Sequence, residues 1–116
     1  MLVYALVLFG LAAALGFLML TLRALGRSWP LGLALVHGLF AASGLVLVLY
    51  AVLTVGADRR LGIAAVLFVL AALFGFTLLI QHLRRKTLPS VPSILLHGLT
   101  ALVAFLLLLL YISTGG

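Results

Sequence analysis

Long apolar runs separated by short polar breaks organise the whole chain. The runs lie at about 1–22, 31–55, 61–81 and 91–112. Each approaches or exceeds the roughly 20 mainly apolar residues that a helix needs to cross a bilayer. The breaks carry nearly all of the charge, at Arg23, Arg27, Asp58, Arg59, Arg60, Arg84, Arg85 and Lys86. The pattern predicts an all-α protein, a four-helix transmembrane bundle that runs up-down-up-down as a single domain over residues 1–116.

Composition supports a membrane protein and excludes several other classes. Of the 116 residues, 67% are hydrophobic and only 7% are charged, which is more apolar surface than a soluble domain of this length has interior to bury. The net charge of +6 does not indicate nucleic-acid binding, because the basic residues lie in short loops beside apolar helices. The chain has no cysteine, so disulfides, thiolate metal sites and covalently attached c-type haem are excluded.

The basic residues also predict an orientation. The first and third breaks carry Arg23, Arg27, Arg84, Arg85 and Lys86, whereas the second carries Arg59 and Arg60, partly offset by Asp58. The positive-inside rule therefore places the first and third breaks in the cytoplasm and both termini outside it. The first apolar run has no basic segment before it and is too long for a signal peptide, so we expect a retained helix. A bacterial inner membrane is the expected location.

The chain repeats itself with a period of about 60 residues. For the first and third apolar runs, a shift of 59 residues superimposes Ala5, Phe9, Ala12, Ala13, Gly16 and Phe17 on Ala64, Phe68, Ala71, Ala72, Gly75 and Phe76. For the second and fourth runs, a shift of 60 superimposes Leu35, His37, Gly38, Leu39 and Ala41 on Leu95, His97, Gly98, Leu99 and Ala101. The repeating unit is a helical hairpin, about 1–56 and 57–116. Parallel repeats are related by a pseudo-two-fold axis along the membrane normal, which makes the second and fourth helices diagonal partners.

Two histidines occupy equivalent positions in the two repeats. His37 and His97 both lie inside apolar runs, where an ionisable residue is a candidate functional site. Each shares its helix face with small residues, which favour helix interfaces, so both imidazoles are expected to point inward. Gly16 and Gly75 lie at the same depth on the other two helices and leave space free of side chains. This layer predicts a shared ligand between the histidines, and one b-type haem is the leading hypothesis.

These four positions resemble the haem-binding core of diheme cytochrome b. That family has four helices, with axial histidines on the second and fourth and glycines on the first and third that make room for the macrocycle. The resemblance covers most of the bundle and implies that His37 and His97 ligate the iron and that Gly16 and Gly75 face the porphyrin. The family's second histidine pair is replaced here by Ala51 and Tyr111. A second haem and the family's quinol chemistry are therefore not implied.

Other interpretations of the histidines remain open from the sequence. Each imidazole could hydrogen-bond a backbone carbonyl or a hydroxyl on a neighbouring helix, as polar side chains do in membrane bundles. The pair could instead ligate another pigment or a metal, although structural zinc wants four ligands and the chain has one acidic residue, in a loop. Arg23 and His82 lie at the cytoplasmic helix ends, where they either anchor the helices at the interface or neutralise haem propionates.

The sequence favours one function and keeps one alternative. The favoured function is single-electron transfer by one bis-histidine haem, with a membrane or periplasmic redox partner or a quinone as the reaction partner. The alternative is a cofactor-free accessory or scaffold subunit of a larger membrane complex. No helix contains the carboxylate typical of proton-coupled drug export, and no hydrolase or transferase motif occurs. Trp29, near a helix end, is expected in the aromatic belt of the membrane interface.

Overall fold

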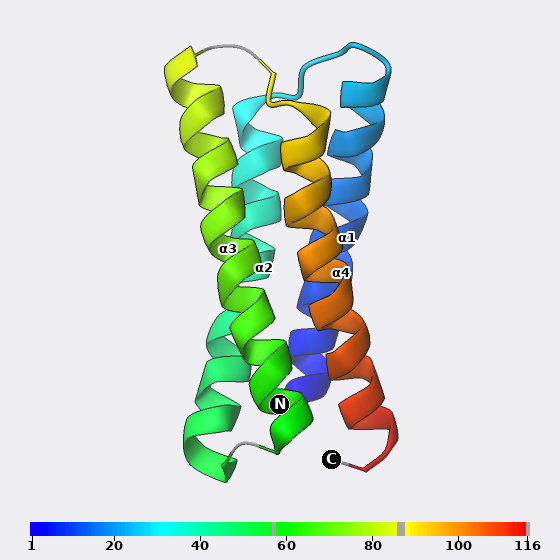
Figure 1. Cartoon of the computed structure of the whole chain (residues 1–116), viewed down its shortest axis with the longest axis vertical. Coiled ribbons are helices and arrows are strands. Elements are labelled where there is room, and N and C mark those ends of the chain that lie inside the picture. The colour runs from blue at the N-terminus through cyan, green and yellow to red at the C-terminus, as the bar shows by residue number, and fades with distance from the viewer. Residues whose placement is uncertain (57, 86–87, 116) are drawn as a thin grey trace.

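The computed structural model describes residues 1–56, 58–85 and 88–115, with Arg85 described by its backbone only. Its four helices are α1 (Leu2–Ala24), α2 (Leu31–Val55), α3 (Arg59–Arg85) and α4 (Val91–Ser113). They run up-down-up-down, and both termini lie at one end of the bundle (Figure 1). The described residues form no strand. Each helix is long and apolar enough to cross a membrane, as the sequence predicted, and the protein is an integral membrane helix bundle.

The bundle is assembled from two hairpins. α1 packs closely along α2 and α3 along α4, whereas the contacts of α2 with α3 and of α1 with α4 are more limited. Within the described residues, no Cα of α2 lies within 8 Å of a Cα of α4. α2 and α4 therefore lie diagonally across the bundle, as predicted, and the two hairpins meet around the central axis.

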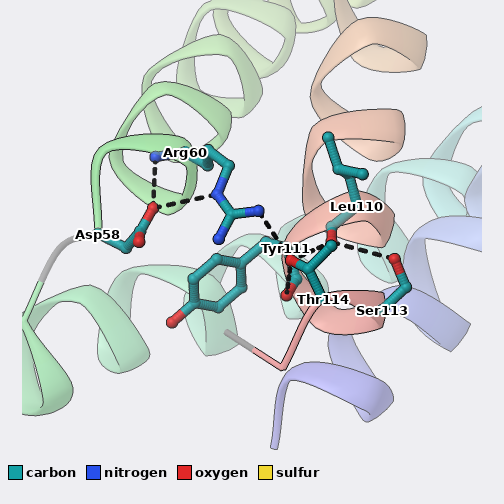
Figure 2. Close-up of polar contacts among 6 residues, drawn as sticks. All are labelled: Asp58, Arg60, Leu110, Tyr111, Ser113 and Thr114. Carbon is teal, nitrogen blue, oxygen red and sulfur yellow. Dashed lines mark hydrogen bonds and ion pairs between the residues drawn. The ribbon is translucent and has the colours of Figure 1, made fainter.

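Local sequence explains where α3 and α4 begin and where α2 ends. Asp58 precedes α3, and its Oδ1 accepts a hydrogen bond of 2.8 Å from the backbone N–H of Arg60 (Figure 2). The Ser90 side chain caps α4 by accepting from the backbone N–H of Ser93. Gly56 ends α2 at a φ of +91°, a conformation that side chains with a Cβ rarely adopt. These caps and turns set the ends of hairpins whose central residues are almost wholly apolar.

The tightly packed core lies in the half of the bundle nearer the termini. It consists of Ala5, Phe9, Val48, Leu61, Ala65, Phe68, Ala104 and Leu108. Phe9 and Phe68 stack across the axis with ring centroids 3.8 Å apart and an interplanar angle of 3°. Gly44 permits this packing, because a Cβ there would lie 3.0 Å from the Phe9 ring. The two phenylalanines occupy equivalent positions in the two repeats, so this half of the bundle has a symmetric aromatic centre.

The other half of the bundle is packed less completely. Its only buried residues within the described ranges are Ala12, Trp29, Ala71 and Pro89. Trp29 is 7% exposed, and its ring stacks on His82 of the other hairpin at a centroid distance of 5.7 Å. Its place in the aromatic belt stays a prediction.

Candidate cofactor site

Each histidine is held by a backbone carbonyl within its own hairpin. His37 of α2 forms a hydrogen bond of 2.7 Å between its Nδ1 and the carbonyl oxygen of Ala12 in α1. His97 of α4 does the same with Ala71 of α3, also at 2.7 Å. A carbonyl oxygen only accepts, so Nδ1 carries the proton and Nε2 of a neutral imidazole carries the lone pair. Both rings therefore have a defined tautomer and a defined orientation.

Glycine allows each ring to lie against the neighbouring helix. A Cβ at Gly16 would be 3.1 Å from Cε1 of His37, and a Cβ at Gly75 would be 2.8 Å from Cε1 of His97. Both distances are shorter than ordinary van der Waals contact, so any side chain at these positions displaces the imidazole. The sequence placed the two glycines and the two histidines in one layer, and the structure brings them together in that way. The direct neighbour of each glycine is an imidazole ring.

The two imidazoles face each other across the bundle. Their ring centroids are 6.1 Å apart, and their planes make an angle of 82°. Neither Nε2 has a hydrogen-bond partner among the described residues. With both protons given to carbonyls, the two Nε2 atoms are both acceptors and do not bond to each other. The layer therefore contains two Lewis-basic nitrogens that no described residue uses.

The histidine layer is less buried than the phenylalanine layer. His37 and His97 are only half-buried although they meet across the centre, whereas Phe9 and Phe68 in the other half are 7% and 5% exposed. No charged or polar residue is fully buried in the described part of the chain. The phenylalanine pair is therefore more completely enclosed than the histidine pair.

The two residues predicted to lie at the cytoplasmic helix ends, Arg23 and His82, form contacts between the hairpins. Arg23 at the end of α1 donates from Nε to the carbonyl oxygen of Pro89, before α4, at 3.0 Å. His82, its equivalent in α3, stacks on Trp29 and has a buried Nδ1 that finds no hydrogen-bond partner among the described residues. Lys86 and the side chain of Arg85, which the sequence counted among the basic residues of this end, lie outside the described residues.

The donor set fits a cofactor that needs two protein ligands. Two imidazoles that ligate one metal from opposite sides have ring centres roughly 6 Å apart, since each nitrogen lies about 2 Å from the metal. The two rings are 6.1 Å apart in an edge-to-face arrangement, a separation that ordinary aromatic pairs also have. The described residues contain no group of three or more histidine, cysteine or acidic side chains that would hold a metal ion alone. A bis-imidazole haem does not need such a group, because the macrocycle supplies the remaining ligands.

The hydrogen bond to a backbone carbonyl of a neighbouring helix, which the sequence left open as an alternative, is present at both histidines, but the sequence did not predict that Ala12 and Ala71 provide the carbonyls. A backbone carbonyl has no side-chain signature. The available signal was the repeat itself, which matches Ala12 with Ala71 as it matches Gly16 with Gly75. Comparison of the chain with family models, with curated proteins and with solved structures found no match. The function is therefore inferred from these residues alone.

Proposed function

We propose that the protein is a membrane-embedded b-type haem protein in which His37 and His97 ligate one iron. The observation that supports this most directly is the opposed pair of imidazoles, each with Nδ1–H donated to a carbonyl and Nε2 without a partner. Metal-ligating histidines commonly donate their second nitrogen to a carbonyl or carboxylate in this way, which fixes the tautomer and raises the basicity of the ligand. Neutral imidazole is a common axial ligand of haem.

The residues around the pair would control how the group is held. The Ala12 and Ala71 carbonyls restrain the two rings, and Gly16 and Gly75 let the rings approach α1 and α3 closely. When bound, haem would supply single-electron chemistry, and two axial protein ligands leave no open iron position for oxygen activation. The role is therefore that of an electron carrier rather than of an enzyme with a substrate site.

Arg23 and His82 are proposed to receive the haem propionates at the cytoplasmic end. The buried Nδ1 of His82 lacks a partner, and an unsatisfied buried polar atom in a folded protein calls for one. A carboxylate would accept from this nitrogen in its protonated tautomer. Arg23 uses Nε for Pro89, and its two other guanidinium nitrogens make no hydrogen bond within the described residues. A cation beside a propionate would reduce the cost of placing that carboxylate at the membrane boundary.

The cellular setting is also part of the proposal. The basic residues of the first and third loops favour a bacterial inner membrane with both termini outside the cytoplasm. Electrons would pass to a membrane or periplasmic redox partner or to a quinone. The site would then lie nearer the cytoplasmic end, because the histidine layer is in the half of the bundle that carries Arg23 and His82.

One observation favours a second candidate function, a cofactor-free accessory or scaffold subunit. The Nδ1 bonds to Ala12 and Ala71 already give each histidine an interhelical partner. Such bonds stabilise membrane bundles by about 0.6 kcal/mol on average. This candidate accounts for the Nδ1 atoms and the glycines, but it leaves both Nε2 atoms and the His82 Nδ1 without a role.

Haem content distinguishes the two candidates. The wild-type chain, expressed with haem supplied and purified in detergent, is expected to be red, to show a Soret band, and to contain one haem per chain by pyridine haemochrome assay. A protein that stays folded and colourless, and that takes up no haem when it is added, supports the cofactor-free subunit instead.

A further inference from the structure

The two hairpins share few directional contacts with each other. The hydrogen bonds of His37 and His97 to backbone carbonyls each stay within one hairpin. Among the described residues, the bond from Arg23 to the carbonyl oxygen of Pro89 is the one hydrogen bond that crosses between hairpins. Each hairpin is therefore held by its own bonds, and the junction between the two depends mainly on packing.

This packing is concentrated in the half of the bundle that carries the termini. The core around the stacked rings of Phe9 and Phe68 joins both hairpins there. Toward the other end, few of the described residues are buried. Lipid gives apolar helices no hydrophobic reason to associate, so membrane helices are held together by close packing and by polar contacts. The half around the histidines has less close packing and depends more on individual contacts.

Four residues beyond the histidine layer supply these contacts, and we call them the clasp: Arg23, Trp29, His82 and Pro89. Arg23, near the end of α1, donates to Pro89, which precedes α4. His82, near the end of α3, stacks on the buried indole of Trp29, which precedes α2. The contacts are reciprocal, because each hairpin offers one helix end to the loop of the other. They join the hairpins at the end opposite the termini (Figure 1).

We propose that the clasp is a gate, and that its opening separates the hairpins at this end while the phenylalanine pair stays closed as the pivot. The histidine layer lies between the pivot and the clasp, since His37 contacts α1 at Ala12 and Gly16, between Phe9 and Arg23. Opening would admit a flat ligand to this layer from the helix ends. Haem entry by this path rests on the proposed function, whereas the opening itself is a property of the haem-free chain.

Distances between spin labels test the gate in the haem-free protein. The chain has no cysteine, so labels attach only to cysteines that are introduced. Leu25→Cys with Leu83→Cys labels both hairpins near the clasp, and Val3→Cys with Leu110→Cys labels both near the termini. All four side chains are exposed in the wild type. Double electron–electron resonance of the full chain in lipid then measures the distance within each pair.

Removal of the indole should release the clasp end only. Trp29→Ala is expected to raise the ratio of long to short distances about fivefold at the clasp pair, the factor for loss of one aromatic contact, and to leave the pair near the termini unchanged. Trp29→Phe keeps an aromatic ring and should retain the wild-type ratio. Tyr50→Ala, which removes an exposed ring at the other end, is the matched control.

Two results of this experiment overturn the proposal. An unchanged distance at the clasp pair in Trp29→Ala shows that the stacking on His82 does not hold the hairpins together. An equal change at both pairs shows that the hairpins separate along their whole length, without a pivot at Phe9 and Phe68.

Haem exchange tests whether the opening serves the histidine layer. In Trp29→Ala, uptake of added haem and its transfer to apomyoglobin are both expected to be about fivefold faster with an unchanged absorption spectrum, because a gate affects passage in both directions. Faster transfer without faster uptake shows that Trp29 only stabilises the bound form, and overturns the gate. A wild type that takes up no haem contradicts the proposed function, and the distances in the haem-free chain then decide the gate.

Discussion

At the scale of single residues, each central imidazole carries a proton on Nδ1 and a lone pair on Nε2, and within the described residues only the Nδ1–H forms a hydrogen bond. The Nδ1–H of His37 and His97 is donated to a carbonyl at 2.7 Å in both hairpins. The lone pairs of the two Nε2 atoms have no hydrogen-bond donor among the described residues. The two environments are equivalent because the internal repeat matches Ala12, Gly16 and His37 with Ala71, Gly75 and His97.

Removal of either imidazole should disrupt the proposed site to a similar extent. His37→Ala and His97→Ala are each expected to lose haem, or to retain it as a high-spin form that binds carbon monoxide, because one axial position opens. Absorption spectra of the oxidised, reduced and carbon monoxide-treated proteins measure this. Circular dichroism checks that both variants remain helical.

His82→Ala is the control for these ligand variants. Its ring lies about 10 Å along α3 from Gly75, seven residues away, so its removal should leave the spin state unchanged. It is expected to lower haem affinity only slightly, through loss of the proposed propionate contact. An unaltered low-spin spectrum in either ligand variant, or a high-spin spectrum in His82→Ala alone, contradicts the assignment.

The glycines beside the histidines provide a graded test. Gly75→Ala should reduce haem occupancy more than Gly16→Ala, because the new Cβ would lie 2.8 Å from the His97 ring but 3.1 Å from the His37 ring. Gly98→Ala is the matched control, since a Cβ there meets nothing within 4 Å. Gly75→Leu should remove most of the haem while leaving the protein inserted. If Gly16→Leu and Gly75→Leu both retain the wild-type spectrum, the imidazoles do not lie where the structure has them.

For single residues, the sequence predicted which side chains lie near each other better than it predicted their hydrogen bonds. The repeat and the small-residue faces were sufficient to expect His37 opposite His97, with a glycine near each. The carbonyls of Ala12 and Ala71 could not be anticipated, because which carbonyl meets a side chain depends on the rotation and offset of adjacent helices. The stacking of Trp29 on His82 could not be predicted either, because the two residues come from different hairpins.

At the scale of helices, two contacts between hairpins close the less packed half of the bundle. Arg23 of α1 reaches the carbonyl oxygen of Pro89, and Trp29 stacks on His82 of α3. The residues come from equivalent regions of the two repeats, so each hairpin contributes a helix end and a loop to the other. These contacts hold the hairpins together beyond the histidine layer, where few side chains are buried.

Loss of the Arg23 contact should loosen this end of the bundle. Arg23→Gln is expected to lower the free energy of unfolding by about 1 kcal/mol, the usual contribution of a hydrogen bond of this kind. Thermal unfolding of the purified protein, followed by circular dichroism, measures the change. Arg27→Gln is the control, because Arg27 is exposed and its side chain makes no hydrogen bond within the described residues. Equal melting temperatures for Arg23→Gln and wild type would show that the bond to Pro89 does not support the fold.

Helix positions were the best predicted feature, with one instructive difference. α2 has the expected bounds, and α1 and α4 differ from expectation by one or two residues. α3 extends over Arg59–Arg85 rather than over 61–81. An apolar run reports only the part of a helix that lies in hydrocarbon, whereas backbone hydrogen bonding continues through the headgroup region. Arginine side chains allow this extension because their charged ends reach water.

At the scale of the whole molecule, the arrangement of charge predicts the orientation in the membrane. Both termini lie at one end of the bundle (Figure 1), and Arg23 and His82 lie near the C-terminal ends of α1 and α3, at the other end. A C-terminal fusion to a reporter that is active only in the cytoplasm should therefore be silent, and one active only outside it should give signal. Strong signal from the cytoplasmic reporter would reverse the orientation and move the histidine layer toward the outer face.

The four-helix architecture followed from hydropathy and the repeat, whereas the division of the bundle into two unlike halves did not. Each helix is apolar enough along its length to span a membrane, so hydropathy alone did not predict that the core is confined to the half around Phe9 and Phe68. The difference arises from side-chain size at the axis. Stacked phenylalanines fill the centre of one half, and glycines and alanines leave the centre of the other half to two imidazoles.

The spin state of the oxidised wild-type protein, saturated with haem, tests the central proposal most directly. Electron paramagnetic resonance combined with absorption spectroscopy reports both the number and the kind of axial ligands. A bis-histidine site between α2 and α4 predicts a low-spin, six-coordinate iron in the oxidised and reduced states, with no binding of carbon monoxide. A high-spin, five-coordinate iron, or a folded protein that binds no haem, would contradict it.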